Sequence, residues 1–73
     1  MNRVLIMDLG DIHVRIVIDT RIIYLLKSSR INTIKELAAC TRSTLIKIRG
    51  IGPRSLRKIE RLLDTYGLGL AGE

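Results

Sequence analysis

The feature that most constrains the fold is the run Gly50–Pro53, in which two glycines enclose one apolar residue and a proline follows. Aliphatic residues at helical spacing flank this run, within Leu45–Ile48 before it and Leu56–Leu63 after it. Two glycines permit a tight reversal of the chain, and proline suits the first turn of a helix. The pattern therefore predicts two helices joined by a short hairpin, with Ile51 turned into the core.

The same hairpin has the chemistry of an anion site. Gly50 and Gly52 carry no side chain that would keep a phosphate from the backbone, and the helix that follows begins with free N–H groups and a positive dipole end. Arg54 and Ser55 add a cation and a hydroxyl donor in the first helical turn. The alternative is that the glycines form only a tight turn. We favour phosphate binding because the aliphatic spacing, Pro53 and the basic residues agree.

The positive charge of the protein is concentrated around this hairpin. Residues 42–61 contain seven lysines and arginines against the single acid Glu60, so this stretch carries the whole net charge of +6. A local positive field is what a polyanionic partner requires. The alternative is a solvated helix face, since many small basic proteins bind nothing specific. On the last helix the basic residues share the face opposite the apolar stripe: Arg54, Arg57, Lys58 and Arg61.

Capping signals predict a mainly α fold, a compact bundle of four to five short helices. The sequence predicts helices over residues 20 to about 27, 34 to about 39 and 42 to about 48. The last helix begins at Pro53, and Gly67 stands where a left-handed C-terminal cap is expected. The N-cap residues of the first three are Asp19, Thr33 with Glu36 as a capping box, and Thr41.

The N-terminal residues have a different pattern. From Ile12 to Ile18, β-branched residues alternate with other residues, and Gly10-Asp11 is a plausible turn after the apolar segment Val4–Leu9. We therefore expect residues 1–18 to form an extended arm or a β-hairpin, which must pack on the helices or on another copy or partner. Residues 19–70 then form the helix-hairpin-helix domain, and residues 71–73 form a tail.

Several classes of function find no support in the sequence. The aromatic residues are only Tyr24 and Tyr66, too few for a platform that stacks single-stranded bases. Cys40 has no partner for a disulfide, and no cysteine–histidine set exists for a metal. His13 has no nearby nucleophile, so we expect no catalytic centre and no cofactor. Because no apolar run approaches the ~20 residues of a membrane span and no secretion signal is visible, we expect a cytoplasmic protein without membrane contact.

From about Asp19 to Leu70 the sequence resembles the C-terminal domain of the bacterial RNA polymerase α subunit. The resemblance implies a compact helical domain that binds the minor groove of A-tract-rich DNA and also touches activators and sigma factor. The large assembly domain of the subunit is missing, so we expect a free-standing relative. The segments that carry the resemblance are Thr20–Lys27, Ile31–Leu37, Leu45–Ile59 and Tyr66–Leu70.

The resemblance also implies roles for individual residues. Arg21 matches the arginine that enters the minor groove, and the negative potential of a narrow A-tract groove supports this assignment. Tyr24 stands where the family usually has a DNA-contacting asparagine, and Lys58 where a glutamate is common. The acidic stretch that faces sigma factor in the family is replaced by His13–Val17. The candidate DNA-binding residues are Arg21, Tyr24, Lys27, Gly50, Gly52, Arg54, Ser55 and Lys58.

Two functions remain open at this point. The first is a non-enzymatic module for double-stranded DNA, linked to transcription regulation through RNA polymerase, with a non-specific Kd of about 10⁻⁴–10⁻⁶ M. The alternative is a protein-interaction module that contacts polymerase or a regulator without DNA, or self-associates through residues 12–18. Tyr24 and the apolar residues 12–18 favour the alternative, whereas Arg21 and the run Gly50–Ser55 favour DNA. A role in DNA repair would rest on the hairpin motif alone.

Overall fold

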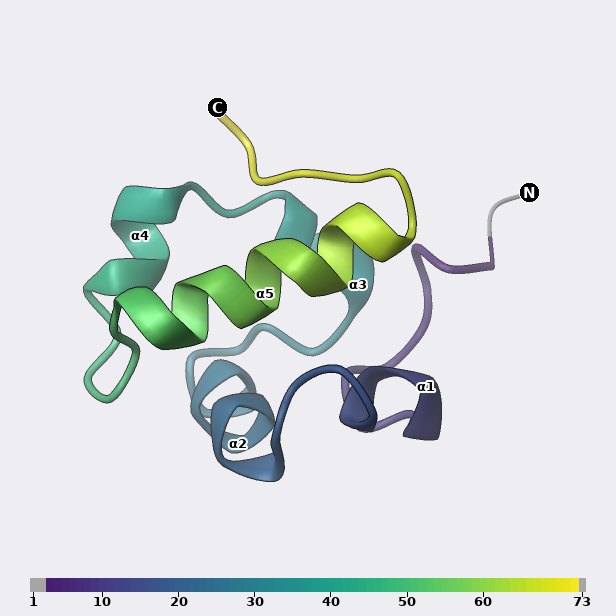
Figure 1. Cartoon of the computed structure of the whole chain (residues 1–73), viewed down its shortest axis with the longest axis horizontal. Helices are drawn as coiled ribbons and strands as arrows, with labels where there is room; N and C mark the ends of the chain where they lie inside the picture. The colour runs from purple at the N-terminus through teal and green to yellow at the C-terminus, as the bar shows by residue number, and fades with distance from the viewer. Residues whose placement is uncertain (1–2, 73) are drawn as a thin grey trace.

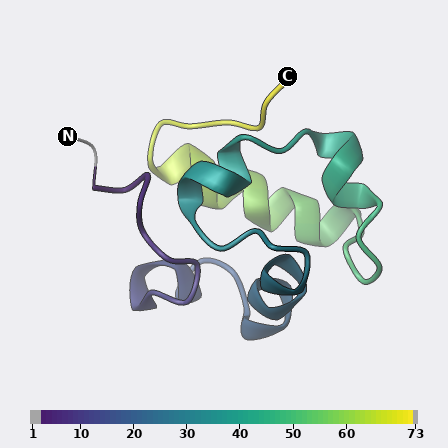
Figure 2. The ribbon, with the colours of Figure 1, turned by 180° about the vertical axis from the view of Figure 1, so that it is seen from behind.

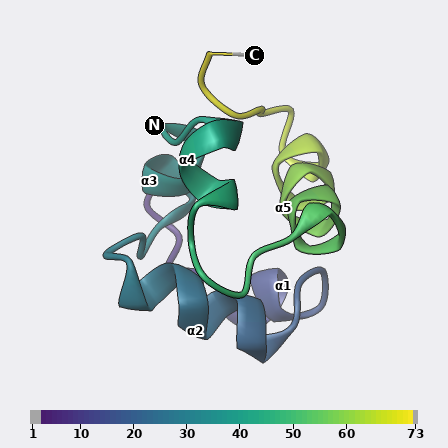
Figure 3. The same ribbon diagram turned by 90° about the vertical axis from the view of Figure 1, so that its left-hand side faces the viewer.

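The computed structural model describes residues 3–72, and five helices lie within this range (Figure 1). The predicted mainly α fold class is confirmed. Figure 3 shows α2 below, α3 and α4 on one side, and α5 on the other, around a space that core side chains fill. The helices are α1 (Ile12–Arg15), α2 (Thr20–Ser28), α3 (Ile34–Ala38), α4 (Arg42–Ile46) and α5 (Pro53–Thr65).

Side-chain caps fix where α2, α3 and α4 begin, as the sequence predicts. The Asp19 carboxylate accepts a hydrogen bond from the Ile22 N–H at 3.0 Å. Thr33 and Glu36 form a complete capping box at the start of α3. The Thr41 hydroxyl accepts from the Thr44 N–H at the start of α4. Each cap satisfies a backbone donor that has no partner inside its helix.

The end of α5 is fixed by the predicted glycine cap. Gly67 has a φ of 71°, in the left-handed region. The Gly67 N–H donates to the Asp64 carbonyl and the Leu68 N–H donates to the Leu63 carbonyl, both at 2.9 Å. These two bonds form a Schellman motif, which turns the backbone back along α5.

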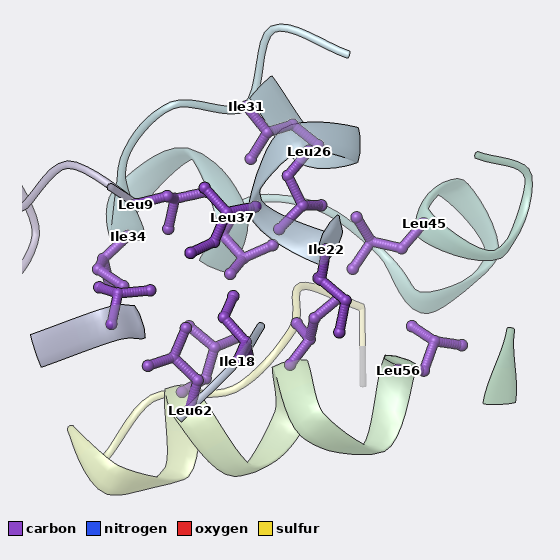
Figure 4. Packing of buried hydrophobic residues seen from close by; sticks show 14 of the residues in the cluster. Leu9, Ile18, Ile22, Leu26, Ile31, Ile34, Leu37, Leu45, Leu56 and Leu62 are labelled. Atoms are coloured by element: carbon purple, nitrogen blue, oxygen red, sulfur yellow. The ribbon is translucent and has the colours of Figure 1, made fainter. Parts of the chain in front are cut away.

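The core is aliphatic and is built largely on α5 and α2. Figure 4 shows Leu56 and Leu62 of α5 facing the side chains of α2, α3 and α4 across the interior. Ile51 is only 5% exposed, which confirms that the residue between the two glycines turns inward. Burial of these side chains removes apolar surface from water and stabilises the helices, most of which are too short to form alone. The buried residues of α2 and α5 include Ile22, Ile23, Leu26, Leu56, Ile59, Leu62 and Leu63.

The predicted β-hairpin or extended conformation is wrong for residues 12–15 of the N-terminal segment. Residues 12–15 form α1, and the Asp11 carboxylate caps this helix by accepting from the His13 N–H at 2.9 Å. The alternating pattern places Val14 and Ile18 four positions apart, a spacing that also matches one helical turn. Both side chains are buried, at 0% and 1% exposure, so packing against the core decides in favour of the helical turn.

Residues 5–9 join the domain through backbone pairing. The Leu9 N–H donates to the Asn32 carbonyl, and the Ile34 N–H donates to the Met7 carbonyl. Figure 2 shows this segment descending beside α3 to reach α1. Leu9 is fully buried, so the segment before Asp19 contributes to the same core as the helices. The parts of the predicted arm and tail that fall on residues 1, 2 and 73 lie outside the described range.

Arg30 offers a direct test of how α2 ends. It is the only non-glycine residue within 3–72 with positive φ, 65°, and it occupies the position that Gly67 holds after α5. A side chain in the left-handed region costs roughly 1–2 kcal/mol. Glycine avoids this cost, but its larger loss of entropy on folding offsets part of the gain. We expect Arg30→Gly to raise the free energy of unfolding by about 0.5–1 kcal/mol in urea titrations. Lys35→Gly, inside α3, is the control and should lower it. No gain in the Arg30 variant would contradict this account of the helix end.

Candidate nucleic-acid interface

Arg21 brings together three of the predicted site residues from separate parts of the sequence. Its Nη1 donates to the Gly50 carbonyl at 2.9 Å, and its Nη2 donates to the Ser55 hydroxyl at 3.2 Å. The start of α2, the hairpin and the first turn of α5 therefore meet at one guanidinium (Figure 3). Arg21 remains exposed, so the two bonds fix the direction of its side chain without removing it from the surface.

Gly50 is required by the backbone at this point. Its φ is 98°, which residues with a Cβ rarely adopt. A Cβ built there would lie 2.9 Å from Leu25 Cδ1 and 3.8 Å from Arg21 Nη1. The bare backbone thus lets Leu25 pack against the hairpin and leaves the Gly50 carbonyl free to accept from Arg21.

Gly52 has a different reason to lack a side chain. Its φ of −117° is open to any residue, and a Cβ there would meet nothing within 4 Å. The fold therefore places no steric demand for glycine at this position. What the absence of a side chain provides is open access from solvent to the first turn of α5.

The first turn of α5 carries free backbone donors. Gly52 makes no side-chain cap, and the first backbone bond of the helix runs from the Leu56 N–H to the Gly52 carbonyl. Within residues 3–72, the N–H groups of Gly52, Arg54 and Ser55 have no hydrogen-bond partner. Free donors at the positive end of a helix dipole attract an anion. The exposed Arg54 adds a positive charge beside them.

Ser55 lies deeper than the sequence suggests. Ser55 is 5% exposed, and its hydroxyl accepts a hydrogen bond from Arg21. This bond helps to position the guanidinium. A hydroxyl that accepts one bond still has a proton to donate. Sequence reasoning missed this buried contact because α2 and α5 are far apart in the sequence.

Lys58 joins the same region through a contact that the sequence did not predict. Its Nζ lies 3.4 Å from the Asp19 carboxylate, the group that caps α2. Both side chains are about half exposed, so the pair contributes little to stability. Its effect is positional, because it holds a positive charge near Arg21 on the flank of α5 that faces α2.

The other two predicted residues lie on α2 but have different surroundings. Tyr24 follows Arg21 by one helical turn and is 70% exposed, and it lines a shallow surface hollow together with Gly10 and Lys27. Lys27 is turned to the N-terminal segment, where its Nζ lies 2.7 Å from the Asp8 carboxylate. The structure therefore does not bring Lys27 into the group formed by Arg21, Gly50 and Ser55, the Arg21 cluster.

Residues 3–72 give no support for a metal-binding cluster, a reactive thiol or a membrane-spanning helix. Within residues 3–72, no group of three or more histidine, cysteine or acidic side chains is placed to hold a metal. Cys40 is half-buried, and burial raises the pKa of its thiol, which disfavours the reactive thiolate. In the same part of the molecule no helix has the length and apolarity to cross a bilayer.

Three carboxylates make folding sensitive to acid. The pKa of Asp8 is lowered mainly by the hydrogen bond from Lys27, and the pKa values of Asp11 and Asp19 mainly by backbone N–H groups. A lowered pKa in the folded state gives stability that is present above the ordinary value of 3.8 and is lost as pH falls through the folded value.

We therefore expect the free energy of unfolding to decrease in urea titrations as the pH falls below about 4. Asp19→Asn keeps an acceptor for the cap but cannot titrate, so it should make this decrease shallower. A free energy of unfolding that rises over the same range would contradict the assignment of these pKa shifts.

Comparison with known proteins identifies relatives of this domain. Residues 18–65 match the family model for the C-terminal domain of the alpha subunit of bacterial RNA polymerase. The sequence is also similar to DNA-directed RNA polymerase subunit alpha of Clostridium kluyveri, with 44% identity over 45 residues. The same subunit of Clostridium perfringens and that of Bacillus velezensis are each 42% identical over 45 residues.

The matched part includes the whole Arg21 cluster and most of the core. The 45 aligned residues are 62% of this protein but 14% of each of these relatives, so the similarity concerns one small part of the polymerase subunit. The family match covers α2 to α5, from the buried Ile18 to the end of the last helix. The protein belongs to the family of C-terminal domains of the bacterial RNA polymerase alpha subunit.

Proposed function

We propose that this protein is a non-catalytic module that binds double-stranded DNA in connection with transcription. In this proposal, Arg21 enters the minor groove while the hairpin and the first turn of α5 bind phosphates of one strand. The observation that carries it is the exposed guanidinium of Arg21, held by Gly50 and Ser55 beside free backbone donors. The resemblance to polymerase alpha subunits supports the link to transcription.

The fixed position of Arg21 suits entry into a groove. A guanidinium has five N–H donors, of which two serve Gly50 and Ser55, so the others remain for a ligand. Because the guanidinium is already held, little rotamer entropy is lost on binding. A narrow A-tract groove has the strongest negative potential, so groove width rather than base contacts would set the sequence preference.

The phosphate contacts follow from the start of α5. Backbone N–H groups of Gly52, Arg54 and Ser55 would bind one phosphate, and the side chains of Arg54 and Lys58 would lie beside its neighbours. Few phosphates are within reach of so small a surface, so affinity should be low and should fall with salt. Tethering to RNA polymerase or to a transcription regulator would raise occupancy.

The two unstrained glycines provide a matched test of this proposal. Gly52 and Gly69 each have open space where a Cβ would be added, and neither has positive φ. We expect Gly52→Ala to weaken binding of an A-tract duplex by about tenfold in fluorescence anisotropy, because the methyl group displaces the phosphate. The loss of folding stability at this N-cap should stay below about 1 kcal/mol.

Gly69→Ala is the control and should bind the duplex as tightly as the parent protein. Urea titrations of both variants separate a loss of binding from a loss of folding. Equal affinity of Gly52→Ala and the parent would contradict phosphate binding at the start of α5.

A second candidate function is protein interaction without DNA. It is favoured by α1 and its C-cap, where Ile12 and Ile16 lie one helical turn apart and are 66% and 78% exposed. Exposed apolar side chains on one helix face are a usual feature of contact surfaces, including contacts between copies of one protein. This candidate requires no DNA binding, so duplex titrations of the parent protein and of Gly52→Ala also separate the two functions.

A further inference from the structure

A second basic site lies on the flank of α5 that faces away from α2. Residues 58 and 60 are about 200° apart around a helix. Lys58 pairs with Asp19 next to α2, whereas Glu60 accepts a hydrogen bond from Arg42 of α4 at 2.7 Å. Figure 3 shows α2 and the segment that follows α5 on opposite sides of α5. On this second flank, a surface hollow of about 640 Å³ lies between α5, Arg42 and residues 68–70.

Three arginines line this hollow. Arg57 and Arg61 lie one turn apart on α5, and Arg42 comes from α4. Arg42 is paired with Glu60, but the guanidinium groups of Arg57 and Arg61 have no hydrogen bond or ion pair among residues 3–72. A free guanidinium can hold a carboxylate or a phosphate through two parallel N–H bonds.

The rest of the lining discriminates between these two anions. Glu60 and Asp64 also line the hollow, so its three positive side chains are offset to a net charge of +1. Leu68 is half-buried and adds an aliphatic surface. A nucleic acid strand binds through a succession of cations along its backbone, which two acids would interrupt. Two free arginines beside an aliphatic surface fit a carboxylate that stands next to an apolar side chain.

We propose that this hollow binds an acidic segment of a partner protein in which an aliphatic residue stands beside one or two carboxylates. The carboxylates pair with Arg57 and Arg61, and the aliphatic residue packs on Leu68. A hollow of this volume accommodates a few side chains. The side chains that line this hollow, Arg57, Arg61 and Leu68, differ from those that meet at Arg21. The proposal extends the DNA-binding function and does not depend on it.

An NMR titration of the isotope-labelled protein tests this site. The probe is a synthetic blocked peptide of alternating glutamate and leucine, and we expect shifts at Arg57, Arg61 and Leu68. Arg57→Gln combined with Arg61→Gln should weaken peptide binding by about tenfold. Arg15→Gln combined with Lys35→Gln is the matched control. It removes the same charge from exposed positions of α1 and α3 and should leave peptide binding within about twofold of the parent.

Two results would overturn the proposal. A peptide with serine in place of leucine that binds as tightly would reduce the site to general charge attraction. Shifts at Arg57, Arg61 and Leu68 with an A-tract duplex, equal to those at Arg21, would assign the hollow to nucleic acid. Failure of DNA binding itself has a different signature, because it would leave Arg21 and Gly52 unshifted while the peptide still binds.

Discussion

Replacing Arg21 with alanine is expected to weaken binding of an A-tract duplex by about 30- to 100-fold. Arg21 makes the proposed groove contact and also holds Gly50 and Ser55, so its loss removes the cation and loosens both neighbours. A hydrogen bond to a charged group contributes roughly 1.5–3 kcal/mol, which sets the size of the effect. Fluorescence anisotropy at low salt gives the affinity, and circular dichroism shows whether the protein remains folded.

Two further variants make the Arg21 result specific. Arg21→Lys keeps the charge but loses the fork that reaches Gly50 and Ser55 together, so we expect an affinity between those of the parent and the alanine variant. Lys35→Ala removes a charge from α3, away from the cluster, and should change affinity by less than about twofold. Parent-like affinity of Arg21→Ala would contradict the proposed groove contact.

Gly50→Ala is expected to lower the free energy of unfolding by about 2–3 kcal/mol, more than Gly52→Ala does. The main cause is the backbone, because φ is 98° and a Cβ strains that conformation. The added methyl group also meets Leu25 Cδ1 at 2.9 Å, although the end of a leucine is free to move. A domain of this size has roughly 4–11 kcal/mol of stability in total, so the transition in urea should shift clearly.

A double-mutant cycle separates the two causes in Gly50→Ala. Combining it with Leu25→Ala removes the steric contact but leaves the backbone strain, so most of the destabilisation should persist. Gly52→Ala is the matched control within the same hairpin, where φ is ordinary and space is open. Equal stability of the Gly50 and Gly52 variants would contradict the requirement for a left-handed glycine at position 50.

Helix starts and ends could be predicted from the sequence because the contacts that fix them are local. Asp19 and Thr33 cap donors three residues away, and Gly67 closes α5 through bonds to the preceding turn. Such bonds depend on residue type and spacing alone. The burial of Ile51 was equally predictable, because an apolar residue between two glycines is removed from water only if it turns towards the core.

The N-terminal segment could not be predicted because its pattern has two solutions. Val14 and Ile18 fit one face of a strand and also one turn of a helix. The Asp11 cap and the burial of both side chains in the core select the helix. The outcome depends on which surface the rest of the protein offers, which local spacing does not contain.

The remaining differences between the predicted site and the observed site come from side-chain contacts between separate helices and segments. Arg21 contacts Ser55 across 34 positions, and Lys27 contacts Asp8 across 19. Sequence reasoning placed Arg21 and Ser55 on the same ligand without expecting them to touch each other. It grouped Lys27 with them, but the Asp8 carboxylate holds Lys27 elsewhere. Side-chain partners of this kind follow from how helices are arranged, not from their separate sequences.

The most direct test of DNA binding is an NMR titration of the labelled protein with an A-tract duplex, at low and then higher salt. Our account predicts shifts concentrated at Arg21, Tyr24, Gly50 to Ser55 and Lys58, which weaken as salt rises, and smaller shifts with a GC-rich duplex of equal length. Absence of shifts at Arg21 and Gly52 at millimolar DNA would contradict it.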